Sequence, residues 1–325
     1  MDAESEQWIE ERMKDRRDKG RQKRLTSRDP SRTVIDASKF SSQVADLAMT
    51  LINLLERDAQ RKFPKLSFPS DIAAILRQIR GTYNLIRFIN ADDTRDDNPD
   101  YRYPYSLVSL PLIRTMIDGF YNITALLESP ARARTFRIDG FFRLRAALAA
   151  DELHYGNEPG WKHYLEERKE QLELSIRRNE LTDPELSDKA NRWPLLGAYL
   201  KQRLWTRNQD LLSRFLLGKW REYSSISHAC YSGLYDLFSF ISDDQVPSEK
   251  RDQLNEAVDL NVAMHYGRAA GVLLCALSEI QHFFKFDSAD IDQRLRDLWE
   301  AMVPVYELRE FYDYRYNSLL RVRKV

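Results

Sequence analysis

The sequence predicts an all-α fold, a multi-helix bundle of about eight to ten helices, and three observations lead to this prediction. Glycine and proline are scarce, with 11 Gly and 12 Pro among 325 residues, and a shortage of turn residues favours long elements. Apolar residues recur at intervals of three and four along most of the chain, which is the period of an amphipathic helix. Almost no segment alternates apolar and polar residues, as a half-buried strand does.

In the first half of the chain, apolar stripes at helical spacing are separated by polar segments. The stripes consist of Leu47, Leu51, Leu54 and Leu55; of Ile72, Leu76, Ile79 and Tyr83; and of Ile113, Ile117, Phe120 and Leu127. Residues 92–105 are polar, acidic and proline-bearing, so they predict a loop before a helix that starts near Pro111. Ser129 and Pro130 end that helix, and a helix rich in Arg and Ala follows to about Leu153.

The second half begins with the clearest break in the chain, residues 155–160. Residues 161–181 are highly charged and predict a solvated helix with internal pairs such as Glu166 with Lys169 and Glu173 with Arg177. Residues 182–185 predict a capped helix start, and residues 242–250 predict a loop. The remaining stripes are Leu211, Phe215 and Leu216, and then Leu260, Met264, Val272, Leu273 and Leu277.

The chain is large enough for a substantial core and has no net charge. A chain of this length buries roughly 75% of the surface that it exposes when unfolded, so disorder is not expected as its main state. The 50 Lys and Arg residues balance 50 Asp and Glu residues. This balance argues against a protein that coats nucleic acid or a membrane with its whole surface, but it permits a local basic patch.

Composition divides the chain into a basic, charged N-terminal arm, residues 1–35, and a single all-helical domain, residues 36–325. The arm suggests contacts to the phosphates of RNA or another polyanion. The candidate contacts are Arg16, Arg17, Arg21, Lys23 and Arg24. Acidic residues precede this run, so a solvated helix or frayed tail is the alternative.

The sequence also predicts a cytoplasmic protein that does not cross a membrane. The N-terminus has no apolar segment followed by a small-residue cleavage site, so no secretory signal is expected. The longest apolar run, near residues 272–277, is far shorter than the roughly 20 residues of a membrane-spanning helix. Cys230 and Cys275 are interpreted as buried residues in a reducing compartment.

Few residues offer metal or cofactor chemistry, and no cofactor is expected. The five histidines include His282, three residues after Glu279, and His154, three after Asp151. A metal-dependent bundle would need Glu279, His282, His154 and a further carboxylate to converge. A packed histidine is the simpler interpretation of His282, which two phenylalanines follow. Phosphate-binding loops, dinucleotide-binding glycine motifs, zinc-protease motifs and nucleophile elbows are absent from the sequence.

Arg221 and His228 form the first candidate catalytic pair. Their seven-residue spacing places them on nearly one helix face, about 10 Å apart along the axis. A guanidinium and an imidazole that bracket one phosphate suit metal-free RNA cleavage, because the imidazole moves protons while the cation stabilises charge on phosphorus. Ser224 and Ser225 are good N-cap residues, so the helix could instead restart there. A satisfied core histidine is the alternative interpretation of His228.

Arg114, Asp118 and Tyr121 form a second candidate group. At helical spacing they share a face beside the apolar stripe that Ile113 and Ile117 begin. Arg114 and Asp118 can form an intrahelical ion pair that also orients another group. The alternative is a surface pair that contributes only a few tenths of a kcal/mol.

Together these segments resemble an uncharacterised family of bacterial helical proteins that is similar to the HEPN superfamily. The matching residues are Leu112, Arg114, Asp118 and Asn122 on one helix and Tyr223, Ser225 and His228 on a later one. Many HEPN proteins are dimeric, metal-independent ribonucleases of toxin, CRISPR or anti-phage systems, and several branches are inactive binding modules. Their motif is an Arg followed by four to six residues and a His, which Arg221 and His228 satisfy. The residue after this Arg is commonly Asn, Asp or His, whereas this chain has Glu222.

The resemblance implies a HEPN-like core with additional helices that acts on RNA as a homodimer, with His228 as general acid and base and Arg221 as the phosphate contact. Tyr223, Arg114 and Asp118 are the expected supporting residues. The function expected is a metal-independent ribonuclease, as a toxin or anti-phage effector. The alternative is a non-catalytic scaffold that binds a protein partner or RNA through residues 161–181 or through the N-terminal arm.

Overall fold

The computed structural model describes residues 38–62, 68–91, 109–202, 206–228, 230, 248–286, 289–303 and 306–320. Within these ranges every regular element is a helix and no strand is present, which confirms the all-α prediction. Helical segments exceed the predicted eight to ten, because short helices of three to six residues lie between the long ones. The N-terminal arm and its five basic candidates lie outside the described residues.

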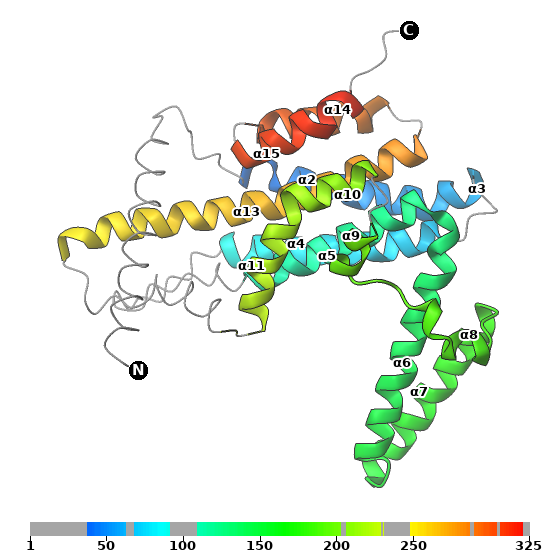
Figure 1. Cartoon of the computed structure of the whole chain (residues 1–325). Coiled ribbons are helices and arrows are strands. Elements are labelled where there is room, and N and C mark those ends of the chain that lie inside the picture. Colours follow the sequence, from blue (N-terminus) through cyan, green and yellow to red (C-terminus); the bar gives the residue numbers. More distant parts are fainter. Residues whose placement is uncertain are drawn as a thin grey trace.

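Four long helices pack along one another as the central bundle (Figure 1). They are α2 (Ser38–Leu54), α4 (Pro69–Ala91), α5 (Ser109–Glu128) and α13 (Ser248–Phe284). Helix α13 begins inside the segment predicted as a loop, because its first residues are polar but include no helix breaker. Helix α5 contacts α4, α13 and α11 (Leu217–Ser227), so it lies at the centre of the molecule.

The core of this bundle includes the predicted apolar stripes of α2, α4 and α5. Leu47, Leu76, Ile113 and Phe120 are all fully buried, as a helix that packs on several neighbours requires. Gly119 allows α5 to approach α4 closely, since a Cβ atom there would lie 2.7 Å from Cγ1 of Ile79. The four helices therefore pack through the faces that the sequence marks as apolar.

Shorter helices complete the chain around this bundle. The segments before α11 are α3 (Gln60–Lys62), α9 (Leu196–Lys201), α10 (Arg207–Leu211) and a π-helical turn (Leu212–Leu216). A further π-helical turn (Leu55–Ala59) joins α2 to α3. The segments after α13 are α14 (Ala289–Met302), α15 (Tyr306–Phe311), another π-helical turn (Tyr312–Tyr316) and α16 (Asn317–Leu319). Among the helices of the described ranges, none is both long and apolar enough to span a bilayer.

A helical hairpin projects from the bundle (Figure 1). It consists of α6 (Ala133–Tyr155) and α7 (Pro159–Arg178), followed by α8 (Asp183–Ser187). The predicted break at residues 155–160 is its turn. Thr182 confirms the predicted cap, because its backbone N–H and its hydroxyl both donate to the Glu185 carboxylate at 2.9 Å.

The charges of α7 pair across the hairpin instead of along α7 as predicted. Glu173 accepts hydrogen bonds from Arg145 of α6 at 2.9 Å, and Lys169 donates to Glu152 of α6 at 3.1 Å. Ile138, Ile176, Leu181 and Leu186 form a small buried apolar cluster of their own in this part of the chain. A two-helix arm has little apolar surface to bury, and the ion pairs between its helices add to the contact that this cluster provides.

Candidate functional site

Helix α11 continues through Ser224 and Ser225 and ends at Ser227, with His228 as its C-cap. The N–H of His228 donates to the carbonyl of Ser224 at 3.0 Å. The Ser225 hydroxyl donates to the carbonyl of Glu222 at 2.7 Å, a bond that serines make inside helices. The unbroken helix, one of the two arrangements open from the sequence, is therefore the one formed, and His228 stands at its exposed end.

Arg114 and Asp118 of α5 meet Trp220 of α11. The indole N–H of Trp220 donates to Oδ1 of Asp118 at 2.7 Å, and Cζ of Arg114 lies 5.4 Å from the centre of the Trp220 ring. Burial raises the pKa of Asp118 above its usual range, while the Trp220 hydrogen bond and the charge of Arg114 oppose the rise. The Asp118 carboxylate therefore joins the two helices at this point.

The guanidinium of Arg114 is only partly satisfied by its neighbours. Its Nε lies 4.0 Å from Oδ2 of Asp118, beyond hydrogen-bond distance, and has no hydrogen-bond partner among the described residues. The neighbouring Arg137, in contrast, donates to both oxygens of Asp71 at 2.8 to 3.1 Å. Nε of Arg114 is thus a buried donor without a hydrogen-bond partner among the described residues.

A cavity of about 650 Å³ lies beside this contact, between α5, the start of α6, the end of α11 and residues 193–196. Its lining includes Arg114, Asp118 and Asn122 of α5 together with Trp220 and His228. Residues from two helices that are distant in sequence thus face one space. The volume lies within the range of about 300–1,000 Å³ that is usual for small-molecule sites.

Tyr121 and Asn122 of α5 bind the segment of residues 193–196, which forms one wall of the cavity. The Asn122 side-chain oxygen accepts a hydrogen bond from the Trp193 indole at 2.8 Å, and the Tyr121 hydroxyl donates to the carbonyl of Pro194. Both bonds fix the 193–196 segment against α5. Trp193 and Phe136, which pack edge to face 5.1 Å apart, also line the cavity.

The predicted catalytic residues are divided among three locations. Arg114, Asp118 and His228 line the 650 Å³ cavity. Arg221 is exposed and is not among the residues that line either of the two cavities described for this part of the chain. Tyr223 is fully buried and points to the other side of α11. The seven-residue spacing of Arg221 and His228 therefore does not bring both side chains to one cavity.

Tyr223 belongs to a buried cluster with His265 and Arg268 of α13. The Tyr223 hydroxyl lies 3.0 Å from Nδ1 of His265, and the Arg268 guanidinium donates to that hydroxyl at 2.9 Å and lies 3.1 Å from the same nitrogen. Because arginine only donates, Nδ1 of His265 acts as an acceptor, which fixes the proton of the neutral ring on Nε2. These contacts tie α11 to α13.

The sequence did not identify Trp220, Trp193 or Arg268 as site residues. Trp220 directly precedes Arg221, which the sequence analysis did select, so this proximity in sequence could have indicated Trp220 as a site residue. No sequence signal indicated Trp193 or Arg268, because their roles arise only from contacts between elements that are distant in sequence.

The candidate metal ligand Glu279 and the two cysteines do not line the 650 Å³ cavity. Glu279 binds Arg315 and Tyr316 instead of facing a metal. In the described part of the chain, no group of three or more His, Cys, Asp or Glu side chains is arranged to hold a metal ion. Cys275 is buried as predicted. Cys230 is exposed, contrary to the prediction, because it lies beyond the end of α11 and not on the apolar face of a helix.

Comparison of the chain with protein-family models, with curated proteins and with solved structures gave no match.

Proposed function

We propose that this protein is a HEPN-like, metal-independent ribonuclease whose active site is the 650 Å³ cavity between α5, α6 and α11. The observation that supports this function best is the convergence of Arg114, Asp118 and His228 on that one cavity. These are three of the five residues that sequence patterns and resemblance select for phosphate chemistry. The resemblance supplies RNA as the substrate class and a toxin or anti-phage role in the cytoplasm.

The proposed chemistry assigns one role to each of these side chains. His228 is exposed at the C-cap of α11, where its ring can take the proton of a ribose 2′-hydroxyl or give one to the leaving oxygen. Arg114 lines the cavity and its side chain is partly exposed, so its guanidinium can contact the non-bridging phosphate oxygens. Asp118 positions Trp220 and Arg114, and the aromatic walls offer faces on which unpaired bases stack.

This arrangement transfers the phosphate contact from Arg221 to Arg114. Glu222, the residue at which the chain departs from the HEPN motif, lies 2.9 Å from the ammonium group of Lys219. Neither side chain of this pair lines the cavity that contains His228. A site centred on Arg114 therefore does not depend on the identity of residue 222.

Cleavage of total RNA and tRNA in EDTA tests the proposal. We expect wild-type protein to cleave and the His228→Ala and Arg114→Ala proteins to be at least about 100-fold slower, the usual loss for a general acid or base. The matched control is His163→Ala, which removes an exposed histidine on the hairpin and should keep full activity.

Arg221→Ala distinguishes the two possible phosphate contacts in the same assay. If it reduces cleavage as strongly as Arg114→Ala, the motif pair and not the cavity contains the site. If folded His228→Ala and Arg114→Ala proteins cleave as fast as wild type, the ribonuclease assignment is wrong.

The second candidate function is a non-catalytic scaffold, favoured by the apolar tip of the hairpin. Leu153 is 80% exposed, and Trp161, which stacks on Tyr155 with ring centres 4.7 Å apart, is 44% exposed. Tyr164 continues this hairpin-tip patch. Clustered apolar groups on a projecting arm are typical of a protein-binding surface.

The hairpin-tip patch is also a candidate for the interface of the implied homodimer. We expect light scattering to show a dimer for the wild type and a monomer for a protein carrying both Leu153→Asp and Trp161→Asp, because each charge would be buried at the interface. Replacing exposed Leu195, which lies outside the hairpin, by Asp is the control. A wild-type monomer, or a double variant that remains dimeric, would contradict this assignment.

A further inference from the structure

Arg114, Asp118 and Asn122 follow one another at four-residue intervals along α5, and all three line the 650 Å³ cavity. Residues at this spacing share one face of a helix, with a rise of about 6 Å from each residue to the next. The row therefore extends for about 12 Å along the α5 side of the cavity. A cation stands at one end of the row, a carboxylate in the middle and an amide at the other end.

The orientation of the Asn122 amide is fixed by Trp193. The Trp193 indole can only donate, and it donates to the side-chain oxygen of Asn122 at 2.8 Å. This bond assigns the oxygen and nitrogen positions of the amide, which are otherwise interchangeable. The amide nitrogen therefore carries the two hydrogen-bond donors that Asn122 offers to a ligand in the cavity.

Asp118, one turn before Asn122, supplies a hydrogen-bond acceptor. Its Oδ1 accepts the Trp220 indole N–H at 2.7 Å, whereas its Oδ2 lies 4.0 Å from Nε of Arg114, beyond hydrogen-bond distance. The Asp118 side chain is 40% exposed, so Oδ2 can accept a hydrogen bond from a ligand in the cavity. An acceptor and a donor group thus lie one helical turn apart on the same face.

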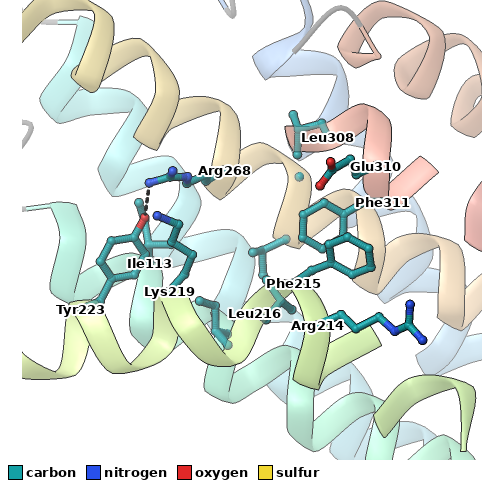
Figure 2. A pocket seen from close by; sticks show the side chains of 13 residues that line it. Ile113, Arg214, Phe215, Leu216, Lys219, Tyr223, Arg268, Leu308, Glu310 and Phe311 are labelled. Atoms are coloured by element: carbon teal, nitrogen blue, oxygen red, sulfur yellow. Dashed lines mark hydrogen bonds between the residues drawn. The ribbon is translucent and has the colours of Figure 1, made fainter. Parts of the chain in front are cut away.

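Helix α11, which carries Trp220, is itself fixed from its opposite side. There Tyr223 faces α13 beside a second cavity of about 180 Å³, and Arg268 donates to the Tyr223 hydroxyl at 2.9 Å (Figure 2). Trp220 is therefore held against Asp118 by the packing of α11 on both α5 and α13. Polar groups that are held in place before a ligand arrives lose less conformational entropy on binding.

We infer that Asp118 and Asn122 form hydrogen bonds with the edge of an unpaired purine base whose phosphate lies at Arg114, an inference that rests on the proposed ribonuclease function. The edge of a purine base carries both donors and acceptors, as this pair of side chains requires. The Watson–Crick edge lies farther from the phosphate in a purine nucleotide than in a pyrimidine nucleotide, so a purine spans more of the row. A two-ring base also stacks over a larger area on the aromatic side chains of the cavity.

Binding of nucleoside 5′-monophosphates tests this inference separately from cleavage, because these probes contain no phosphodiester bond. The measurement is a ligand-observed NMR titration of the full-length wild-type protein. We expect AMP and GMP to bind at least about tenfold more tightly than CMP and UMP. This comparison needs no variant, so it tests the purine preference even if a substitution at Asn122 prevents folding.

Asn122→Asp tests the contact with the base edge. The variant keeps an oxygen for the Trp193 indole but replaces the amide donors by a second acceptor. Guanine has two adjacent N–H donors on its Watson–Crick edge, whereas adenine would place a ring acceptor against the new carboxylate. We expect the ratio of GMP affinity to AMP affinity to rise at least about tenfold. The matched control is Asn84→Asp on α4, which lies outside the cavity and should leave the ratio unchanged.

Three results would overturn the inference. They are the absence of purine monophosphate binding, equal affinity for purine and pyrimidine monophosphates, and the same GMP-to-AMP ratio in folded Asn122→Asp and wild-type proteins. Purine-selective binding by a protein that cleaves no RNA would contradict the ribonuclease proposal and support the base contacts. Failure of the proposed function and failure of this inference are therefore separate outcomes.

Discussion

We expect Glu279→Ala to lower the free energy of unfolding by about 3–5 kcal/mol. Glu279 is 3% exposed and accepts hydrogen bonds from Arg315 through both carboxylate oxygens and from the Tyr316 hydroxyl at 3.0 Å. Burial disfavours the charge of Arg315, but the hydrogen bond and charge of Glu279 outweigh it and hold the pKa of Arg315 above its usual range. Removing the carboxylate leaves a buried guanidinium without its counter-charge.

Urea unfolding followed by circular dichroism measures this loss. The control is Glu173→Ala, which breaks the partly exposed pair with Arg145 on the hairpin and should cost about 1 kcal/mol or less. Replacing both Glu279 and Arg315 by leucine should recover much of the loss, since no buried charge then remains. Equal midpoints for Glu279→Ala and Glu173→Ala would show that the buried pair does not stabilise the fold in this way.

Trp299→Ala is expected to destabilise the protein by about 3–5 kcal/mol, the usual cost of removing a buried aromatic ring. Trp299 is fully buried between α13 and the C-terminal helices. Its indole N–H donates to the Ser278 hydroxyl at 3.0 Å, and its ring stacks on Tyr316 with centres 4.8 Å apart. The substitution therefore removes a fully buried contact of α14 with α13 and leaves a cavity there.

The same unfolding experiment with Trp161→Ala provides the comparison. Trp161 has the same side chain at the exposed tip of the hairpin, so its loss should cost about 1 kcal/mol or less. We also expect faster hydrogen exchange in α14 of the Trp299→Ala protein, because that helix would open separately. Unchanged exchange in α14 together with a small loss of stability would contradict the assigned role of Trp299.

The helices could be predicted because their causes are local. The three- and four-residue spacing of Leu47, Leu76 and Ile113 marks the buried faces of α2, α4 and α5, and these residues are buried in the bundle. The cap formed by Thr182 and Glu185 was likewise visible, since both partners lie within one turn. The polar start of α13 was mistaken for a loop, because charge alone does not distinguish a solvated helix from a loop.

Contacts between helices could not be predicted in the same way. Residues Glu173 and Lys169 have possible partners within α7, yet they pair with Arg145 and Glu152 because α6 lies beside them. Spacing within one helix restricts which side chains share a face. It does not state which other helix covers that face, and this depends on packing of the whole chain.

The sequence by itself determined the helical class, the positions of the main helices and the selection of Arg114, Asp118 and His228 as residues of interest. Only the tertiary structure decided that these three line one cavity, that Tyr223 turns to Arg268 and that Arg221 stays outside. The physical reason is that each cavity forms between elements distant in the chain. Its lining therefore depends on which faces α5, α6, α11 and α13 bury against one another.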